Sequence, residues 1–185
     1  LGSVWGNKNM TMTLSHCTNN GNTTVNEGGV AGFVSSIVNN EIISVVFSDC
    51  INNGNVMSDH FYQGGFVGSV SSNTNMTMMI SRCVNNGIIT GGDSYSGGFV
   101  GSISGSKNTT VTISNSINNG NVTGRSFVGG LVGQVDSFNK DDSIFFTVIN
   151  SANKGTVSAK SYYGCGLFCV SSYSKDYNVS TTVLN

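Results

Sequence analysis

The sequence is poor in charge and contains neither proline nor a long apolar run. Charged residues make up 9% of its 185 residues, and the formal net charge is −1. Because no stripe of lysine and arginine is available to neutralise phosphates, the composition argues against a nucleic-acid partner. No apolar stretch approaches the ~18–20 residues that a membrane-spanning helix needs, so we expect no membrane span in this segment. Because weakly charged proteins tend to associate, the composition suits a protein that forms part of an assembly.

The usual signatures of a metal, cofactor or hydrolytic site are also missing. Neither His16 nor His60 flanks a Cys-x-x-Cys motif, so the spacing predicts no metal site. The glycine-rich stretches do not open a helical pattern and therefore predict no phosphate-binding loop. The acidic residues occupy different repeat positions, except that Asp59 and Asp93 share one variable corner, and no pair stands out as glycoside hydrolysis requires. We predict a non-enzymatic protein without cofactors.

What the sequence has instead is a repeat. A block with the pattern Gly-Gly-Phe-Val-Gly recurs with variations at residues 31–37, 64–70, 97–103, 129–133 and 165–169. A second block ends in Asn-Asn-Gly or Asn-Lys-Gly, and its successive copies begin 33, 33, 33 and 35 residues apart. A fixed period of this size is typical of repeat architectures, in which each unit needs its neighbours to bury its apolar face. The copies of the second block begin at Cys17, Cys50, Cys83, Ser116 and Ser151.

Each repeat contains three apolar segments, and none of them has a helical period. The second segment alternates apolar residues with polar ones, as at Met76, Met78 and Ile80, which predicts a strand with one buried face. We expect Asn-Asn-Gly to bend the chain, since Asn and Gly tolerate left-handed conformations. The sequence therefore predicts an all-β fold, a parallel β-solenoid of about five ~33-residue turns with three short strands each, stacked at about 4.8 Å. A β-propeller is the alternative, although ~33 residues are few for a four-stranded blade.

In-register stacking of the repeats predicts two internal ladders. One would contain Phe33, Phe66, Phe99, Leu131 and Leu167, and the other Leu14, Phe47, Ile80, Ile113 and Val148. Four valines alternate with the first ladder and would then point outward as an apolar stripe for a second layer or a partner. These are Val34, Val67, Val100 and Val132. The opposite assignment, with the valines inside and the first ladder outside, would imply the same apolar stripe.

We expect a single repeat array over residues 1–185. It divides into a partial turn 1–30, turns 31–63, 64–96, 97–128 and 129–164, and a partial turn 165–185. Because both ends fall within a repeat, we interpret the chain as a piece of a longer protein.

Two blocks carry a resemblance to a known family. Asn-Ser-Ile-Asn-Asn-Gly-Asn-Val-Thr-Gly at 115–124 and Gly-Gly-Leu-Val-Gly at 129–133 resemble the GLUG-type repeat, and the likeness covers nearly the whole chain. That repeat occurs in large secreted and surface-anchored proteins, including bacterial adhesins and surface proteases. The resemblance implies an extracellular, adhesive or stalk-like role. The chain departs from the repeat pattern at residues 31–36 and 165–169.

The repeats differ from one another mainly at two corners. One lies before the second segment and is longest at residues 136–142. The other follows the third segment and carries aromatic residues, and in solenoids such variable corners often bind partners. The simpler interpretation is that these rings cover the corner beneath them. The candidate partner surface comprises Phe61, Tyr62, Tyr95, Phe127, Tyr162 and Tyr163.

Six Asn-x-Ser/Thr sequons fall into columns. They predict either N-glycans along a corner of a secreted eukaryotic protein or turn asparagines followed by strand-forming residues, and the sequence leaves both open. Asn9, Asn75, Asn108 and Asn178 share one repeat position, and Asn22 and Asn121 share another.

The cysteines are candidate disulfides or buried thiols. Cys17, Cys50 and Cys83 form a column in which at most two can pair with each other, and buried thiols are the favoured interpretation. Cys165 and Cys169 can form a disulfide only if the strand between them bends.

Polar columns are expected as well. His16, Asp49 and Arg82 occupy successive copies of one position, which predicts an exposed ladder rather than an acid–base cluster. The asparagine columns that begin at Asn19 and Asn20 are expected to hydrogen-bond from turn to turn.

The sequence therefore predicts a non-enzymatic extracellular or cell-surface scaffold, acting as a stalk, adhesin segment or filament subunit that presents a rigid repeated surface. The expected partners are other copies of the chain, surface proteins or glycans. The alternative is a parallel β-helix protein that binds or cleaves polysaccharides. A regular Thr-x-Thr array, which ice binding would need, is interrupted at Ser44-x-Val46 and Thr77-x-Met79.

Overall fold

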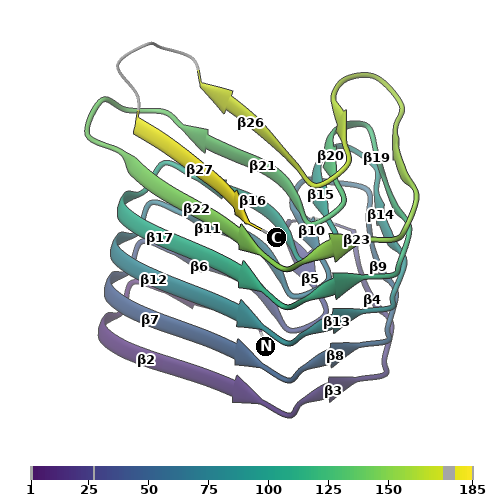
Figure 1. The fold of residues 1–185 in the computed structure, drawn as a ribbon, viewed down its shortest axis with the longest axis horizontal. Coiled ribbons are helices and arrows are strands. Elements are labelled where there is room, and N and C mark those ends of the chain that lie inside the picture. Colours follow the sequence, from purple (N-terminus) through teal and green to yellow (C-terminus); the bar gives the residue numbers. More distant parts are fainter. Residues whose placement is uncertain (1, 27, 173–177, 185) are drawn as a thin grey trace.

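The computed structural model describes residues 2–26, 28–172 and 178–184. These residues wind into stacked turns of β-structure (Figure 1), and none of them lies in a helix that could cross a membrane. Each strand pairs in parallel with its counterpart in the next turn, as Val67 does with Val34 on one side and Val100 on the other. The predicted β-solenoid is confirmed, and the propeller alternative is wrong because the sheets run through all the repeats.

Two long sheets form most of the wall. The first sheet has six strands: β1 (Ser3–Trp5), β6 (Val34–Val38), β11 (Val67–Ser71), β16 (Val100–Ser104), β21 (Val132–Ser137) and β26 (Phe168–Ser172). The second sheet also has six: β2 (Lys8–Ser15), β7 (Glu41–Ser48), β12 (Thr74–Ser81), β17 (Lys107–Ser114), β22 (Ser143–Ile149) and β27 (Asn178–Leu184).

Three five-stranded sheets of short strands complete each turn. The third sheet consists of β3 (Thr18–Asn19), β8 (Ile51–Asn52), β13 (Val84–Asn85), β18 (Ile117–Asn118) and β23 (Ala152–Asn153). The fourth consists of β4 (Thr23–Val25), β9 (Val56–Ser58), β14 (Ile89–Gly91), β19 (Val122–Gly124) and β24 (Val157–Ala159). The fifth consists of β5 (Val30–Ala31), β10 (Gln63–Gly64), β15 (Ser94–Gly97), β20 (Ser126–Gly129) and β25 (Gly164–Cys165).

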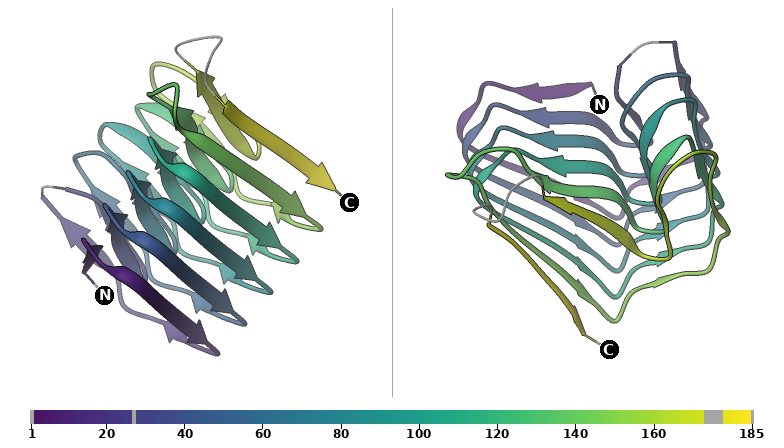
Figure 2. Two further views of the ribbon diagram at one scale, coloured as in Figure 1. Left: turned by 90° about the vertical axis from the view of Figure 1, so that its left-hand side faces the viewer. Right: turned by 90° about the horizontal axis from the view of Figure 1, so that it is seen from above.

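A turn therefore contains five strands, so the prediction of three strands per turn is wrong. The third predicted segment bends at Asn-Asn-Gly and becomes two strands, and the variable corner ends in a further short strand. In the view from above, the two long sheets meet at one corner and the short fourth and fifth sheets form a smaller lobe (Figure 2, right).

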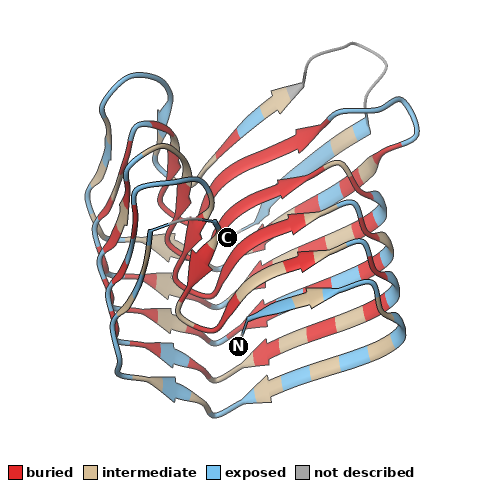
Figure 3. Ribbon diagram, turned by 180° about the vertical axis from the view of Figure 1, so that it is seen from behind, coloured by how far each residue is buried: buried red, intermediate tan, exposed pale blue. Residues whose placement is uncertain are grey.

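The main core lies between the long sheets, and a second core fills the smaller lobe. Both predicted ladders lie in the main core, where the rings of Phe33, Phe66 and Phe99 follow one another at 4.9 and 5.0 Å. The second core contains Val30, Val56, Ile89, Val122 and Val128. Because the first sheet lies between the main core and the smaller lobe, its central strands are buried along most of their length (Figure 3).

The expected outward valine stripe is wrong. Val34, Val67, Val100 and Val132 are fully buried in the same core as the phenylalanines that precede three of them. The chain bends at Gly65 and Phe66, so the alternation of an extended strand does not hold there. The start of the fifth sheet approaches the opposite face of the first sheet, and a Cβ at Gly68 would lie 2.8 Å from the carbonyl oxygen of Tyr62.

The Asn-Asn-Gly corner bends for a different reason from the one expected. None of its Asn or Gly residues has a positive φ; His16, Asp49 and Arg82, which precede the corner, adopt φ of 54°, 55° and 51° instead. Glycine is needed because the turns stack so closely that a Cβ at Gly87 would lie 2.0 Å from the carbonyl oxygen of Gly54.

Side-chain amides hold this corner together, as predicted. Asn85 Nδ2 donates to the carbonyl of Gly87 at 3.0 Å and to Oδ1 of Asn118 at 2.7 Å, while its own Oδ1 accepts from Asn52 at 2.8 Å. The buried ladder runs from Asn19 to Asn153, and an exposed ladder runs parallel to it, from Asn20 through Asn53 and Asn86 to Asn119.

A third amide ladder escaped the sequence analysis. Asn7, Asn40 and Asn73 stack where the first sheet meets the second, and Asn40 Nδ2 donates to Asn73 Oδ1 at 3.0 Å. The signal was present as asparagines 33 residues apart. Throughout the described chain, every buried side-chain nitrogen and oxygen has a hydrogen-bond partner.

Candidate binding surfaces

The aromatic corner forms a continuous stack of rings along the start of the fifth sheet. Tyr62, Tyr95, Phe127 and Tyr163 come from four successive turns, with ring centroids 5.2, 5.5 and 5.0 Å apart. Phe61 adds a ring 6.2 Å from Tyr95, and Tyr162 one 6.3 Å from Tyr163. We call these six residues the aromatic corner.

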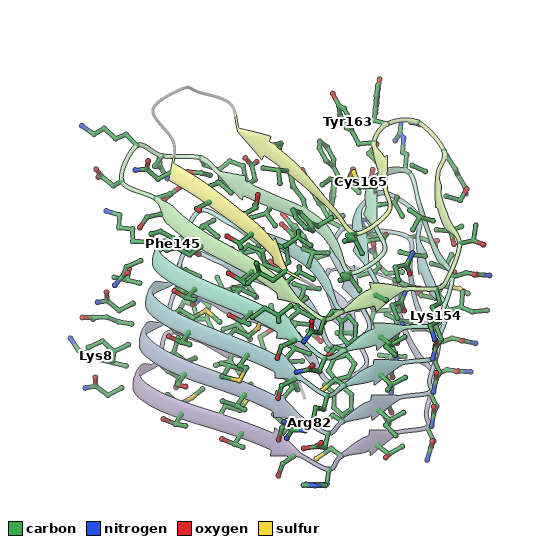
Figure 4. The ribbon with its side chains drawn as sticks, in the orientation of Figure 1. Lys8, Arg82, Phe145, Lys154, Tyr163 and Cys165 are labelled. Carbon is green, nitrogen blue, oxygen red and sulfur yellow. A yellow bond between two sulfur atoms is a disulfide. The ribbon has the colours of Figure 1, made fainter. Side chains whose placement is uncertain are left out.

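The faces of the rings are covered by neighbouring rings of the stack. The rings of Tyr62 and Tyr95 are nearly parallel, with 10° between their planes, so the stack presents mainly ring edges to the side. Its middle rungs are half-buried, and burial raises the pKa of Tyr62. The ends are open: Phe61 is 42% exposed, and Tyr162 and Tyr163 are 65% and 64% exposed (Figure 4). The rings cover their corner, and partner binding there stays a prediction.

The backbone at this corner is strained in a repeated way. Tyr62, Tyr95, Phe127 and Tyr163 have φ of 67°, 70°, 50° and 35°, a region that bulky residues rarely occupy. In the first turn Gly29 takes the equivalent place, since Val30 pairs with Gln63. Ring stacking offsets the backbone cost of four aromatic residues in left-handed conformation.

Charged side chains follow the aromatic corner from turn to turn. Asp59 precedes Phe61, Asp93 precedes Tyr95, Arg125 precedes Phe127 and Lys160 precedes Tyr162. The backbone of this segment is in contact between turns: the N–H of Arg125 donates to the carbonyl of Asp93 at 2.8 Å, and that of Ser161 to the carbonyl of Arg125 at 2.8 Å. Asp59 lies against Gly92, the residue before Asp93. The charges therefore follow one another along the corner in one column, with two acids toward the N-terminal turns and two bases toward the C-terminal turns.

The outer face of the second sheet is broad and carries no charge in its central columns. In-register pairing aligns one column as Thr11, Ser44, Thr77, Thr110, Phe145 and Ser180. The next aligns Thr13, Val46, Met79, Thr112, Thr147 and Thr182. Lys8 and Glu41 form an ion pair of 3.0 Å at the start of these strands, and Arg82 and Asp49 form one just beyond their end (Figure 4).

The sequon asparagines line the edge of this face. Asn9, Asn75 and Asn108 are exposed with φ of 54°, 54° and 46°, and Asn108 Nδ2 donates to Asn75 Oδ1 at 2.7 Å. Ile42 takes the equivalent place in the second turn with φ of 55°, a strained conformation for a β-branched residue. A shallow hollow surrounds Ile42, between Asn9 and Asn75.

The remaining sequons differ in setting. Asn22 and Asn121 are exposed, and each Oδ1 accepts a backbone N–H from the next turn at 2.9 Å. Asn178 is exposed at the start of β27. All six are accessible at the surface, and glycan occupancy stays a prediction.

The His16–Asp49–Arg82 column is an exposed ladder. Arg82 donates from Nε and Nη2 to the two oxygens of Asp49, each at 2.7 Å, while His16 Nε2 lies 4.0 Å from Asp49 Oδ2. The hydrogen bond from Arg82 lowers the pKa of Asp49. Side-chain exposure is 81% for His16 and 59% for Arg82, so no enclosed acid–base site forms there.

The cysteines divide into free thiols and one disulfide. Cys17, Cys50 and Cys83 are free, and burial raises the pKa of Cys50 and brings that of Cys83 to about 11. The backbone N–H of Cys83 donates to Ser116 Oγ at 3.0 Å, which fits a column of small buried residues. Cys165 and Cys169 form a disulfide with Cα atoms 5.5 Å apart, because the chain bends at Gly166 and Leu167 between them.

The burial of two carboxyl groups, those of Asp136 and Asp142, escaped the sequence analysis. Asp136 is fully buried in β21, where Oδ1 accepts from the backbone of Ser137 at 2.8 Å and Oδ2 from Gln134 Nε2 at 3.2 Å. Burial raises its pKa. Asp142 closes the loop that follows by accepting the backbone N–H groups of Phe138 and Asn139. These acids fix the longest corner, and no cluster of metal-ligating side chains occurs in the described ranges.

Comparison with known proteins gives no match: no family model, no curated protein and no solved structure is similar to this chain.

Proposed function

We propose that the chain is a non-enzymatic extracellular scaffold with a structural or adhesive role, and that the outer face of the second sheet is its adhesive surface. The observation that carries the proposal is the two central columns of that face, twelve aligned positions without a charge. Parallel strands lie ~4.8 Å apart and alternate residues ~6.6 Å apart, so the face forms a nearly regular grid of hydroxyl and apolar groups. An uncharged grid of this kind suits neutral, hydroxyl-bearing polysaccharide surfaces.

The disulfide supports the extracellular part of the proposal, because disulfides persist mainly in oxidising compartments. The resemblance to GLUG-type repeats points the same way. Mass spectrometry of the natively purified, unreduced chain tests this part. Glycans on Asn9 or Asn75, or an intact Cys165–Cys169 bond, support secretion, whereas bare asparagines with all five thiols free would contradict it.

Retention on insoluble neutral polysaccharides tests the adhesive part. Cellulose and chitin serve as probes, with an anionic polysaccharide for comparison. The double variant Thr110→Lys/Thr112→Lys places two charges on the proposed face and should abolish retention on the neutral probes. Thr90→Lys/Thr123→Lys is the matched control, since it adds the same charge at half-buried threonines of the fourth sheet.

Three results would count against the adhesive proposal: no retention of the unmodified chain on either neutral probe, equal retention of both double variants, or retention only on the anionic probe. Release of new reducing ends from the probes would favour the alternative, a polysaccharide-cleaving parallel β-helix protein.

A further inference from the structure

The aromatic corner and its charge column share one centre of symmetry. The aromatic rungs run Tyr62, Tyr95, Phe127, Tyr163, and the charged residues beside them run Asp59, Asp93, Arg125, Lys160. The midpoint of both series lies between the third and fourth of the five stacked corners. A two-fold rotation about an axis through that midpoint exchanges the first member of each series with the last, and the second with the third.

We propose that two copies of this chain pair side by side and antiparallel through the aromatic corner. The two-fold arrangement brings Asp59 of one copy against Lys160 of the other, and Asp93 against Arg125. The same rotation sets Tyr62 opposite Tyr163 and Tyr95 opposite Phe127. The inference deepens the proposed scaffold role, on which it rests, by naming a second copy as a partner.

The charge column favours this partner and this direction. A parallel pairing would bring Asp59 against Asp59 and Lys160 against Lys160, and like charges in contact oppose association. Within one copy, Asp93 and Arg125 are already near each other at 3.8 Å, whereas Asp59 and Lys160 have no ion pair among the described residues. The outer charges of the column are therefore free for a second copy. The net charge of −1 adds almost no general repulsion.

The charges favour the antiparallel arrangement of the two copies, and the aromatic side chains supply the apolar surface of the contact. Phe61, Tyr162 and Tyr163 are exposed beside half-buried Tyr62, Tyr95 and Phe127, which makes one contiguous aromatic patch over four turns. Such patches mark interaction sites, and tyrosine is among the residues that contribute most to interface energy. Because the rings stack on each other, they are held rigid before binding, which lowers the entropy lost on association.

A carbohydrate is a weaker candidate than a second copy as the partner of the aromatic corner, because the ring faces are already covered. Sugar recognition by an aromatic ring uses the open face of the ring, and here each middle ring has neighbours on both faces. Ring edges and tyrosine hydroxyls can instead pack against the ring edges and hydroxyls of a second copy. Polysaccharide binding and self-pairing are thus assigned to different surfaces.

A charge-inversion series tested by sedimentation equilibrium decides the proposal. The unmodified chain should dimerise reversibly. Asp59→Lys/Asp93→Lys makes the column wholly basic, and Arg125→Glu/Lys160→Glu makes it wholly acidic. Each variant alone should bind itself at least about tenfold more weakly than the unmodified chain. An equimolar mixture of the two should associate again, and the variant with all four inversions should dimerise like the unmodified chain.

Four outcomes overturn the pairing: a monomeric unmodified chain at all accessible concentrations, dimers that the inversions do not weaken, a mixture that fails to associate, or a fourfold variant that fails to dimerise. All inverted residues are at the surface, and circular dichroism checks that each variant is folded. Thr110→Lys/Thr112→Lys should leave dimerisation unchanged. An unmodified chain that dimerises but is not retained on either neutral probe would contradict only the adhesive proposal, whereas one that is retained but stays monomeric would contradict only the pairing.

Discussion

Two corners of the same turn follow opposite rules. The Asn-Asn-Gly corner repeats almost without change, whereas the aromatic corner changes in length, charge and ring type from turn to turn. At the first, buried amides and glycines contact the turns above and below, as Asn85 and Gly87 do, so each residue is constrained by two neighbours. At the second, the side chains are exposed or half-buried and contact their neighbours through the stacked rings and the ion pair between Asp93 and Arg125. Residues whose buried side chains contact both neighbouring turns cannot vary in sequence. Residues whose side chains lie near the surface can vary, and such variation can create a specific binding surface.

The largest effect is expected from the buried amide. Asn85→Ala removes the hydrogen bonds of Asn85 with Asn52 Nδ2, Asn118 Oδ1 and the backbone carbonyl of Gly87 and opens a small cavity, which should cost about 3–5 kcal/mol of unfolding free energy. Asn86→Ala is the control, since it removes an exposed rung of the neighbouring ladder. Denaturant unfolding with similar losses in both variants would contradict the difference between inner and outer amides.

The second-largest loss of stability is expected from substituting a glycine of the Gly-Gly-Phe-Val-Gly block. A Cβ at Gly65 would lie 2.2 Å from the carbonyl oxygen of Gly98 and 2.6 Å from Asn85 Oδ1, so Gly65→Ala should cost about 2–3 kcal/mol. Gly166 is the equivalent residue of the last described turn, and a Cβ there would meet nothing within 4 Å. Gly166→Ala should therefore leave the thermal midpoint nearly unchanged. Equal losses at the two glycines would show that close stacking is not the reason for glycine.

Substitutions at the aromatic corner should destabilise the protein less than those at Asn85 or Gly65. Tyr95→Ala removes three ring contacts, with Phe61, Tyr62 and Phe127, and should cost only about 1–2 kcal/mol. Tyr162→Ala, at the open end of the stack, should cost less than thermal unfolding can resolve. The comparison fails if Tyr95→Ala is as damaging as Asn85→Ala.

One substitution should stabilise the protein. Ile42 is the single β-branched residue among the described side chains with positive φ, and Ile42→Asn would relieve that strain and join Asn9 to Asn75 in one ladder. We expect a gain of about 1 kcal/mol in a chain produced in bacteria, where the new sequon stays unmodified. Ile42→Val keeps the β-branch and should give no gain. A loss of stability in Ile42→Asn would indicate that the hollow around Ile42 is needed for packing.

The smallest effect on stability concerns the thiols. With a pKa of about 11 caused by burial, Cys83 should be alkylated at least about a hundredfold more slowly than an exposed thiol at pH 8. Cys17, half-buried in the first described turn, should react first. Mass spectrometry of the native chain gives the order. Rapid labelling of Cys83 without unfolding would mean that the Asn-Asn-Gly corner opens readily.

The sequence was most informative where stacking alone decides the structure. A constant period places Phe33 on Phe66 and Asn52 on Asn85, so the ladders could be predicted without knowing the path of the chain. The path itself was less predictable. Alternation implies an extended strand, and the bend at Gly65 and Phe66 brings two adjacent side chains into one core.

The candidate surfaces show the same limit. The aromatic residues of the corner could be named from the sequence, but the stacking of their rings on one another depends on a left-handed backbone at Tyr62 and Tyr95. Of the charge column, the sequence placed only Asp59 and Asp93 in one corner, because corners of unequal length hide the alignment of Asp93 with Arg125. Asp136 gave no signal at all, since its burial depends on the first sheet being covered on both faces.

The uniform register also determines how such a chain can fold. Most strand pairings join residues 33 positions apart, so the first two turns must close long loops before they gain any sheet. Every later turn closes a loop of similar length but adds to an existing template, which makes nucleation slow and propagation fast. Because one turn adds a strand to nearly every sheet at once, the length of the array sets its cooperativity.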